Sequence, residues 1–259
     1  MSKNAGGRFL FLAFQGGNEP RDLIYKSRGL RCLFIRMKKV VFQFVCSCAC
    51  LAIVISYGQT NPPMLLKAGT SAFEAHDYDA ALTNFSKCIQ LYPQSADAYC
   101  GRGMCKWWLH DDSGAVADYD EAIALNPKCG GYYCNRGQAK FAMKKCGDAL
   151  ADYNKSIELD PGNAQAYFNR GTLKVLCLTN YTEAISDFNK AIDLHTDPQP
   201  EDVYFMRGCV KQQLKDFPGA IADYSKALEL NPSSDWSNAV LAKTNLELAR
   251  KLMLDSQKK

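Results

Sequence analysis

Residues 136–161 read RGQAKFAMKKCGDALADYNKSIELDP, and this stretch decides the fold because the chain repeats it. Its opening word, Arg-Gly-x-x-Lys, occurs four times at intervals of 34, 34 and 37 residues: RGMCK at 102–106, RGQAK at 136–140, RGTLK at 170–174 and RGCVK at 207–211. Its closing phrase, ALADYNKSIELDP, has four counterparts: ALTNFSKCIQLYP, AVADYDEAIALNP, AISDFNKAIDLHT and AIADYSKALELNP. Such a period indicates a stack of similar units, each too small to fold alone.

Each unit contains two amphipathic helical segments whose small residues recur at fixed places. Glycine and alanine let two helix backbones approach closely, and an aromatic ring fills the space beside them. A proline after the second segment ends it, because proline cannot donate a backbone hydrogen bond. The glycines are Gly69, Gly103, Gly137, Gly171 and Gly208; the alanines are Ala81, Ala115, Ala149, Ala184 and Ala220; the aromatics are Phe85, Tyr119, Tyr153, Phe188 and Tyr224.

This pattern resembles the tetratricopeptide repeat family over about residues 62–234. The resemblance implies an all-α, right-handed superhelical solenoid of helix-turn-helix repeats. Five repeats are expected at residues 62–95, 96–129, 130–163, 164–200 and 201–234. The fourth is three residues longer, and the extra residues fall in loops. An open solenoid must cover its last apolar face, so residues 235–255 are expected to form a capping helix. Its apolar side is read as Trp236, Val240, Leu241, Leu248 and Leu252.

Four units depart from the family pattern by carrying a set of three charges. An arginine stands before the small glycine, a lysine follows four residues later, and an aspartate lies on the second segment. The unit starting at residue 62 has none of the three. Because the three charges are all present in four units and all absent from the fifth, we expect ion pairs that join the two helices of each hairpin. The other interpretation is an arginine strip for an anionic ligand. The expected structural pairs are Arg102 with Asp118, Arg136 with Asp152, Arg170 with Asp187, and Arg207 with Asp223.

The resemblance also places a ligand-binding groove on the concave face, formed by the first segments. Large aromatics with amides suit a peptide, since rings supply burial and amides bond its backbone. Trp107 and Trp108 are the expected centre of binding. Phe73, Trp107 and Phe141 hold one repeat position and could instead pack against the neighbouring helix. The predicted groove residues are Phe73, Met104, Trp107, Trp108, Asn135, Gln138, Phe141, Phe168, Asn169, Thr172, Phe205 and Met206.

Other site chemistries find little support in the sequence. The family's clamp for acidic chaperone tails is incomplete, because Cys100 and Met104 stand where its lysine and asparagine are expected. No glycine-rich phosphate loop, nucleophile elbow or zinc-protease motif occurs. His76 and His110 are expected in solvated turns. We therefore expect no enzyme activity, no cofactor and no metal.

The first 58 residues differ in composition from the rest of the chain. They hold nine basic residues against two acidic ones, whereas residues 59–259 carry a net charge of −3. That slightly acidic body argues against nucleic acid as a partner, since phosphate binding needs clustered lysine and arginine.

The leader has the features of an export signal. Residues 37–58 combine two lysines, an apolar stretch and small residues at Ser56 and Gly58, which is typical of a cleaved signal peptide. An uncleaved anchor through residues 40–57 and a lipoprotein at Cys46 or Cys48 are the alternatives. Residues 1–36 are interpreted as an over-extended start and residues 59–61 as a linker.

Eight of the 12 cysteines lie beyond the leader. An even number in an exported protein permits disulfides. Cys88, Cys105 and Cys177 are expected in the core as small apolar residues. The other five lie near the groove or the turns and could form disulfides, but the sequence does not determine which cysteines pair. They are Cys100, Cys129, Cys134, Cys146 and Cys209.

Together these features predict an exported, non-catalytic adaptor that holds a segment of a partner protein in its groove. The alternative is a self-associating component of an envelope or secretion assembly, which would make its contacts through the convex face or the chain ends. A membrane contact is expected only through an uncleaved leader, and a homo-oligomer is compatible with both hypotheses.

Overall fold

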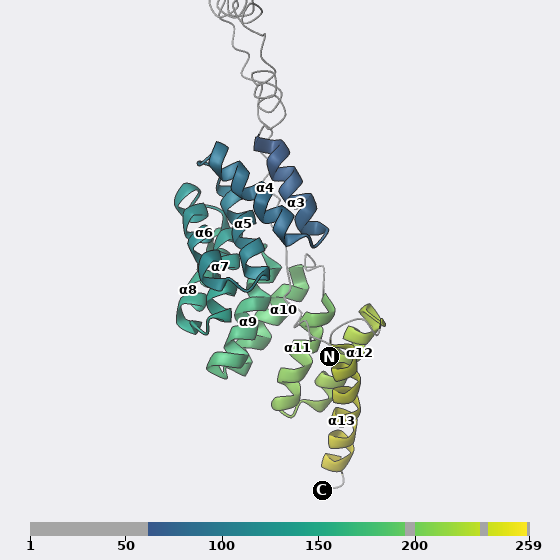
Figure 1. The fold of residues 1–259 in the computed structure, drawn as a ribbon. Helices are drawn as coiled ribbons and strands as arrows, with labels where there is room; N and C mark the ends of the chain where they lie inside the picture. Colours follow the sequence, from purple (N-terminus) through teal and green to yellow (C-terminus); the bar gives the residue numbers. More distant parts are fainter. Residues whose placement is uncertain (1–61, 195–199, 234–237, 258–259) are drawn as a thin grey trace, which may run out of the picture.

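The computed structural model describes residues 62–194, 200–233 and 238–257. Within them the chain forms eleven α-helices and no β-strand, stacked as five helix pairs and one last helix (Figure 1). The predicted all-α solenoid is thereby confirmed. The predicted leader and linker, residues 1–61, lie outside the described residues. The pairs are α3 (Pro62–Glu74) and α4 (Tyr78–Leu91), α5 (Ala96–Trp108) and α6 (Asp112–Leu125), α7 (Gly130–Ala142) and α8 (Cys146–Leu159), α9 (Ala164–Leu178) and α10 (Tyr181–Leu194), and α11 (Pro200–Gln213) and α12 (Phe217–Leu230), followed by α13 (Ala239–Gln257).

The first helices of the pairs line the concave face. Helix α3 contacts α5, and the contacts continue from α5 to α7, α7 to α9, α9 to α11 and α11 to α13. Among the described helices, the second helices make no such contacts with one another. Helices on the inside of a curved stack lie closer together than those on the outside. The groove therefore belongs to α5, α7, α9 and α11, as the repeat pattern predicts.

Local sequence signals set the helix ends. Asp77, Asp111 and Asp216 each accept a backbone hydrogen bond at 2.9–3.0 Å and so cap the second helices that follow them. Helices α4, α6, α8 and α12 each end two residues before a proline. The turn between paired helices contains one left-handed residue in every pair: His76, His110, Lys144, Thr179 and Lys215, with φ between 51° and 67°.

The predicted glycines and aromatics interlock the helices of each pair. Tyr153 is 1% exposed, and its ring packs so closely on Gly137 that a Cβ added there would lie 2.7 Å from Cε1. The same contact joins Gly103 to Tyr119, at 2.9 Å from such a Cβ. A glycine is required at these places because no side chain fits between the helix and the ring.

We expect Gly137→Ala to lower the free energy of unfolding by about 1 to 3 kcal/mol, because the buried Tyr153 ring must move. Gly147 in α8 is the matched control, since nothing lies within 4 Å of an added Cβ there. Gly147→Ala should raise stability by up to about 1 kcal/mol through helix propensity. Urea titrations followed by circular dichroism check both values, and equal effects of the two changes would contradict the interlocking.

Helix α13 covers the last pair, but its predicted apolar side is wrong. Ala239, Ala242, Leu246 and Ala249 pack against Phe205, Ala220, Tyr224 and Ala227 of α11 and α12. The larger side chains point away, with Val240 73%, Leu241 50% and Leu248 42% exposed. Alanines let α13 approach closely, and a search for bulky residues overlooks them. The helix begins at Ala239 and ends at Gln257 rather than spanning 235–255, and Trp236 lies outside the described residues.

Candidate functional site

The charged residues of each departing repeat meet in one cluster. Arg136 donates from Nη2 to Asp152 Oδ1 at 2.6 Å and from Nε to Asp152 Oδ2 at 3.0 Å. Lys140 Nζ lies 2.8 Å from the same Oδ2. The structure thus brings each predicted arginine to its aspartate and adds the lysine as a third member. The other clusters have the same geometry: Arg102, Lys106 and Asp118; Arg170, Lys174 and Asp187; Arg207, Lys211 and Asp223.

Further contacts occupy the outer sides of the arginines. Each guanidinium lies 5.3–5.5 Å from the ring centre of a tyrosine one turn earlier: Tyr99, Tyr133, Tyr167 and Tyr204. In three clusters Nη1 donates to the preceding pair, at Asp120, Asn154 and Asn189. These contacts favour the structural interpretation over an anion-binding strip. The sequence analysis did not predict that the tyrosines and the acceptors of the preceding pair contact the arginines, although both sets of residues recur with the repeat period.

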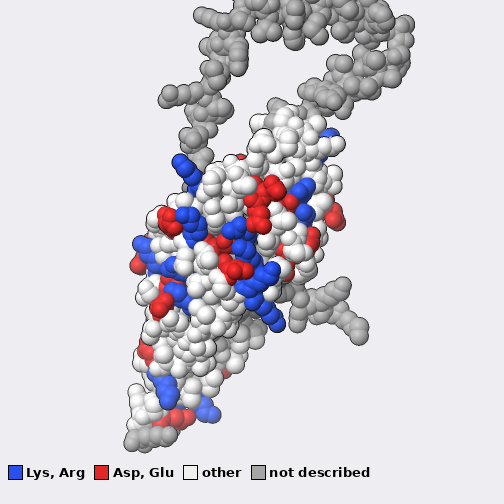
Figure 2. Space-filling model, turned by 90° about the vertical axis from the view of Figure 1, so that its left-hand side faces the viewer, with Lys and Arg blue, Asp and Glu red and all other residues white. Residues whose placement is uncertain are grey.

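The aspartates of these clusters are buried ions. Their side chains are 4–6% exposed, while the arginines are 16–23% exposed. Hydrogen bonds to Asp118 raise the pKa of Arg102, so its charge persists at physiological pH. On the face drawn in Figure 2, Lys and Arg lie intermixed with Asp and Glu over the middle of the molecule, and more of both lie toward its lower end.

A pocket of about 330 Å³ is lined by residues of α5, α7, α8, α9 and α11 and by Asn238, which precedes α13. Its walls are mainly apolar, and amide, hydroxyl and carboxylate groups are spread among them. It contains seven of the twelve predicted groove residues: Trp107, Gln138, Phe141, Phe168, Asn169, Thr172 and Met206. Ala142, Tyr153, Asp202 and Asn238 complete the lining.

Five predicted groove residues do not line this pocket. Phe73, Met104 and Phe205 are 4–5% exposed and pack in the core between neighbouring helices. Asn135 donates from Nδ2 to Cys100 Sγ at 3.5 Å. Trp108 stacks on Tyr78 of α4, with ring centres 5.3 Å apart and planes 8° apart.

The two tryptophans therefore have different surroundings. Trp107 reaches the pocket, although it is only 6% exposed and also belongs to the core around α5. Trp108 fills the contact with the preceding pair. Exchanging both for alanine would disturb packing and groove together, so smaller, half-buried lining residues give cleaner tests of binding.

The polar side chains of the pocket differ in their hydrogen bonding. Asn169 accepts from Gln165 Nε2 at 2.9 Å through Oδ1, while its Nδ2 donates to Cys134 Sγ at 3.5 Å. Thr172 presents a buried hydroxyl, and the described residues contain no hydrogen-bond partner for its Oγ1. A buried polar atom costs free energy unless it is bonded, so this hydroxyl indicates where a ligand group would bond.

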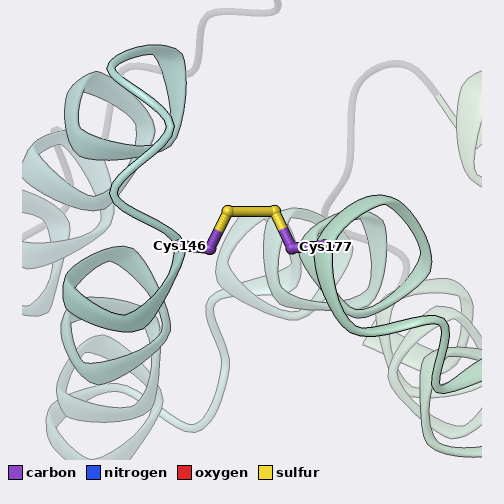
Figure 3. The surroundings of a disulfide bond; sticks show 2 residues. All are labelled: Cys146 and Cys177. Carbon is purple, nitrogen blue, oxygen red and sulfur yellow. A yellow bond between two sulfur atoms is a disulfide. The ribbon is translucent and has the colours of Figure 1, made fainter.

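A disulfide joins Cys146 at the start of α8 to Cys177 near the end of α9 (Figure 3). Cys177 packs against the core cluster around Tyr153, as expected, but it is half-buried and bonded to Cys146 instead of being a free core thiol. Cys88 and Cys105 are buried as expected. Cys100 and Cys134 are free and buried, and Cys129 and Cys209 are free and half-buried, so none of these four forms a disulfide in the structure.

Burial raises the pKa of the thiols of Cys100, Cys105 and Cys134 from 9.0 to about 12. The folded chain therefore holds these protons more tightly than the unfolded chain. The resulting stability is complete below about pH 9 and is lost as the pH rises toward about 12. We expect the urea midpoint to be constant near neutrality and to fall above about pH 9. The urea midpoint of a variant with these three cysteines changed to alanine should fall less steeply with pH. Equal slopes for this variant and wild type would contradict the assignment.

The described part of the chain offers little to other kinds of site. No group of three or more His, Cys, Asp or Glu residues there could hold a metal ion. None of its helices combines the length and apolar character needed to cross a bilayer. His76 and His110 take left-handed conformations in equivalent turns and are exposed.

Solved structures with the same fold are only distantly similar in sequence. TTC0263, a thermophilic TPR protein of Thermus thermophilus, is 21% identical with a TM-score of 0.62, over 72% of this chain and 99% of its own. The pilF protein of Pseudomonas aeruginosa is 14% identical with a TM-score of 0.61, over 73% and 88%. YrrB, described as a TPR protein with an unusual peptide-binding site, is 19% identical with a TM-score of 0.53, over 74% and 97%. No curated protein sequence matches the chain.

Family models match along the solenoid. Models described as tetratricopeptide repeat match residues 66–128 and 201–234, and one described as TPR repeat matches residues 137–174. These matches cover just over half of the chain and fall on the helix pairs described above. The protein therefore belongs to the tetratricopeptide repeat family.

Proposed function

We propose that this protein is a non-catalytic adaptor that holds a segment of a partner protein in its concave groove. The observation that carries the proposal is the pocket lined mainly by α5, α7, α9 and α11, which combines aromatic rings with amides and the Thr172 hydroxyl. Rings desolvate a bound segment and polar groups bond its backbone, which is how grooves of this size recognise peptides. The description of YrrB as peptide-binding supports the same use of the fold.

The test uses a variant that fills the pocket without removing core atoms. Thr172 is half-buried and lines the pocket, so Thr172→Arg places a long charged side chain there. Ser186→Arg on α10 is the matched control, because Ser186 is exposed on an outer helix. Quantitative mass spectrometry of co-purifying proteins should show partners that are lost with Thr172→Arg and kept with Ser186→Arg. Identical partner sets for both variants, with normal circular dichroism, would place binding elsewhere.

We further propose that the protein is exported. The signal-like residues 37–58 motivate this, and the Cys146–Cys177 disulfide supports it because structural disulfides persist in oxidising compartments. N-terminal sequencing of the native protein tests it. A start at Gln59 is the expected result, retention of residues 40–57 would indicate a membrane anchor, and reduced protein in the cytosol would contradict export.

Self-association is a second candidate function because α13 exposes large apolar side chains. Val240, Leu241, Leu248 and Leu254 are 42–73% exposed, which is typical of surfaces that contact another molecule. If this helix joins two copies, Leu241→Glu/Leu248→Glu will convert an oligomer to a monomer in light scattering. A monomeric wild-type chain would exclude this use of α13.

A further inference from the structure

Helix α13 lies at one end of the helix stack (Figure 1) and packs against α11 and α12 through its alanines and Leu246. Successive helix residues point about 100° apart, so Val240, Leu248 and Leu254 lie on the half of α13 that is turned away from α12. They are 73%, 42% and 54% exposed. A polar outer face on the last helix keeps a solenoid soluble, so this apolar face indicates contact with another molecule.

The other end of the stack does not match this face. Helix α3 exposes mainly small or charged residues there, including Lys67, Ser71 and Glu74. Met64, at 56%, is the only exposed large apolar side chain in the described part of α3. Stacking α13 of one copy on α3 of another would therefore place apolar residues against a mainly polar surface. A second α13 presents the same apolar side chains and is the better match.

The charges on the outer half of α13 are self-complementary in one orientation. Glu247 and Lys251 are both exposed there, one residue before and three residues after Leu248. If two α13 helices run antiparallel and cross near Leu248, Glu247 of each copy lies beside Lys251 of the other. In a parallel pair, equal residues would lie at equal heights and like charges would meet. Charges that flank a helix pair set its orientation, so this pattern favours the antiparallel pair.

The apolar residues obey the same symmetry. Val240 lies eight residues before Leu248 and Leu254 lies six residues after it. In the antiparallel pair Val240 therefore comes within about 3 Å, measured along the helix axis, of the height of Leu254 in the second copy. Leu248 meets its own counterpart at the centre. A contact between two helices of 19 residues is at the small end of specific interfaces, so we expect a dissociation constant in the micromolar range.

We propose that two copies of the protein associate through antiparallel α13 helices, related by a two-fold axis near Leu248, with Glu247 of each copy paired with Lys251 of the other. The inference rests on self-association, the second candidate function, and adds the arrangement and the residues that fix it. The same surface serves both copies, as in most homodimers. One assembly then carries two concave pockets and can hold two partner segments.

The first experiment uses the two-fold axis, because only residues near such an axis meet their own counterparts. Leu248→Cys in the purified protein is oxidised with copper phenanthroline and air, and mass spectrometry identifies the joined peptides. Arg250→Cys is the matched control, since Arg250 is exposed on the same helix but points about 200° away from Leu248. We expect a dimer joined through position 248 in the first variant and little dimer joined through position 250 in the second.

The second experiment exchanges the charges and leaves the apolar residues in place. Glu247→Lys and Lys251→Glu each bring like charges together twice per dimer, so each should weaken the dimer about 3- to 10-fold. The double variant Glu247→Lys/Lys251→Glu should restore the dissociation constant of wild type. Light scattering over a range of protein concentrations gives the constants, and circular dichroism checks that α13 remains helical.

The outcomes separate this inference from the functions on which it rests. A wild-type dimer that does not crosslink at position 248, or whose constant ignores the charge exchange, would overturn the two-fold arrangement and leave self-association standing. A wild-type chain that stays monomeric at high micromolar concentration and gives no crosslink would overturn both. Neither result bears on the concave pocket, which Thr172→Arg tests separately.

Discussion

Replacing Asp152 with alanine is expected to lower the free energy of unfolding by about 3 to 5 kcal/mol, because two cations lose their shared buried partner. Asp152 is 6% exposed and accepts from Arg136 and Lys140 at 2.6–3.0 Å. Without it, Arg136 keeps its exposed ion pair with Asp120 and its contact with the Tyr133 ring, and Lys140 loses its ion pair. Urea titration of the full solenoid measures the loss.

The same arginine offers the control. Asp120 pairs with Arg136 Nη1 at 2.6 Å, but its side chain is 54% exposed. Water screens such a pair, so Asp120→Ala should cost no more than about 1 kcal/mol. A loss at Asp152 as small as that at Asp120 would show that the buried cluster does not join α7 to α8. The anion-binding interpretation of the arginines would then regain support.

Breaking the Cys146–Cys177 disulfide is expected to cost about 3 to 4 kcal/mol, because the bond closes a loop of about 30 residues in the unfolded chain. The two cysteines are 31 positions apart and their Cα atoms are separated by 6.4 Å. The bond ties the start of α8 to the end of α9, across the boundary of two helix pairs. Cys146→Ser/Cys177→Ser, compared with wild type in the absence of reductant, gives the value.

Reducing agent provides the matching control for this bond. Dithiothreitol should lower the urea midpoint of wild type to that of the double serine variant and leave the variant unchanged. If dithiothreitol has no effect on wild type, the bond is absent in the native protein. The support that it gives to export would then be withdrawn.

The sequence predicts the helix pairs well because the residues that repeat are the ones that interlock. A glycine equivalent to Gly137 and an aromatic equivalent to Tyr153 recur in every pair, because the ring occupies the space beside the helix that the glycine leaves open. Arg136 and Asp152 are predictable for a similar reason, because a buried charge requires its partner within the same hairpin. The repeat period therefore predicts the contacts between the two helices of a pair.

Contacts between neighbouring pairs are harder to predict from the spacing of residues in the sequence. Trp107 and Trp108 are neighbours in α5, so they point about 100° apart. Trp108 stacks on Tyr78 of the preceding pair, and Trp107 lines the pocket. The Cys146–Cys177 bond escapes prediction because its two cysteines belong to different pairs and no other pair has a cysteine at either position. Helix α13 buries alanines rather than its bulkiest residues, since a close approach to α12 needs small side chains.

The central claim, that the concave pocket holds a partner segment, is tested most directly by photo-crosslinking. Met206 lines the pocket and is half-buried, so benzoylphenylalanine at this place should crosslink a partner in native extracts. The product should be lost when Thr172→Arg is added, and the same label at Ser186 on α10 should give none. Crosslinks from Ser186 alone, or crosslinks from Met206 that persist with Thr172→Arg, would contradict the account.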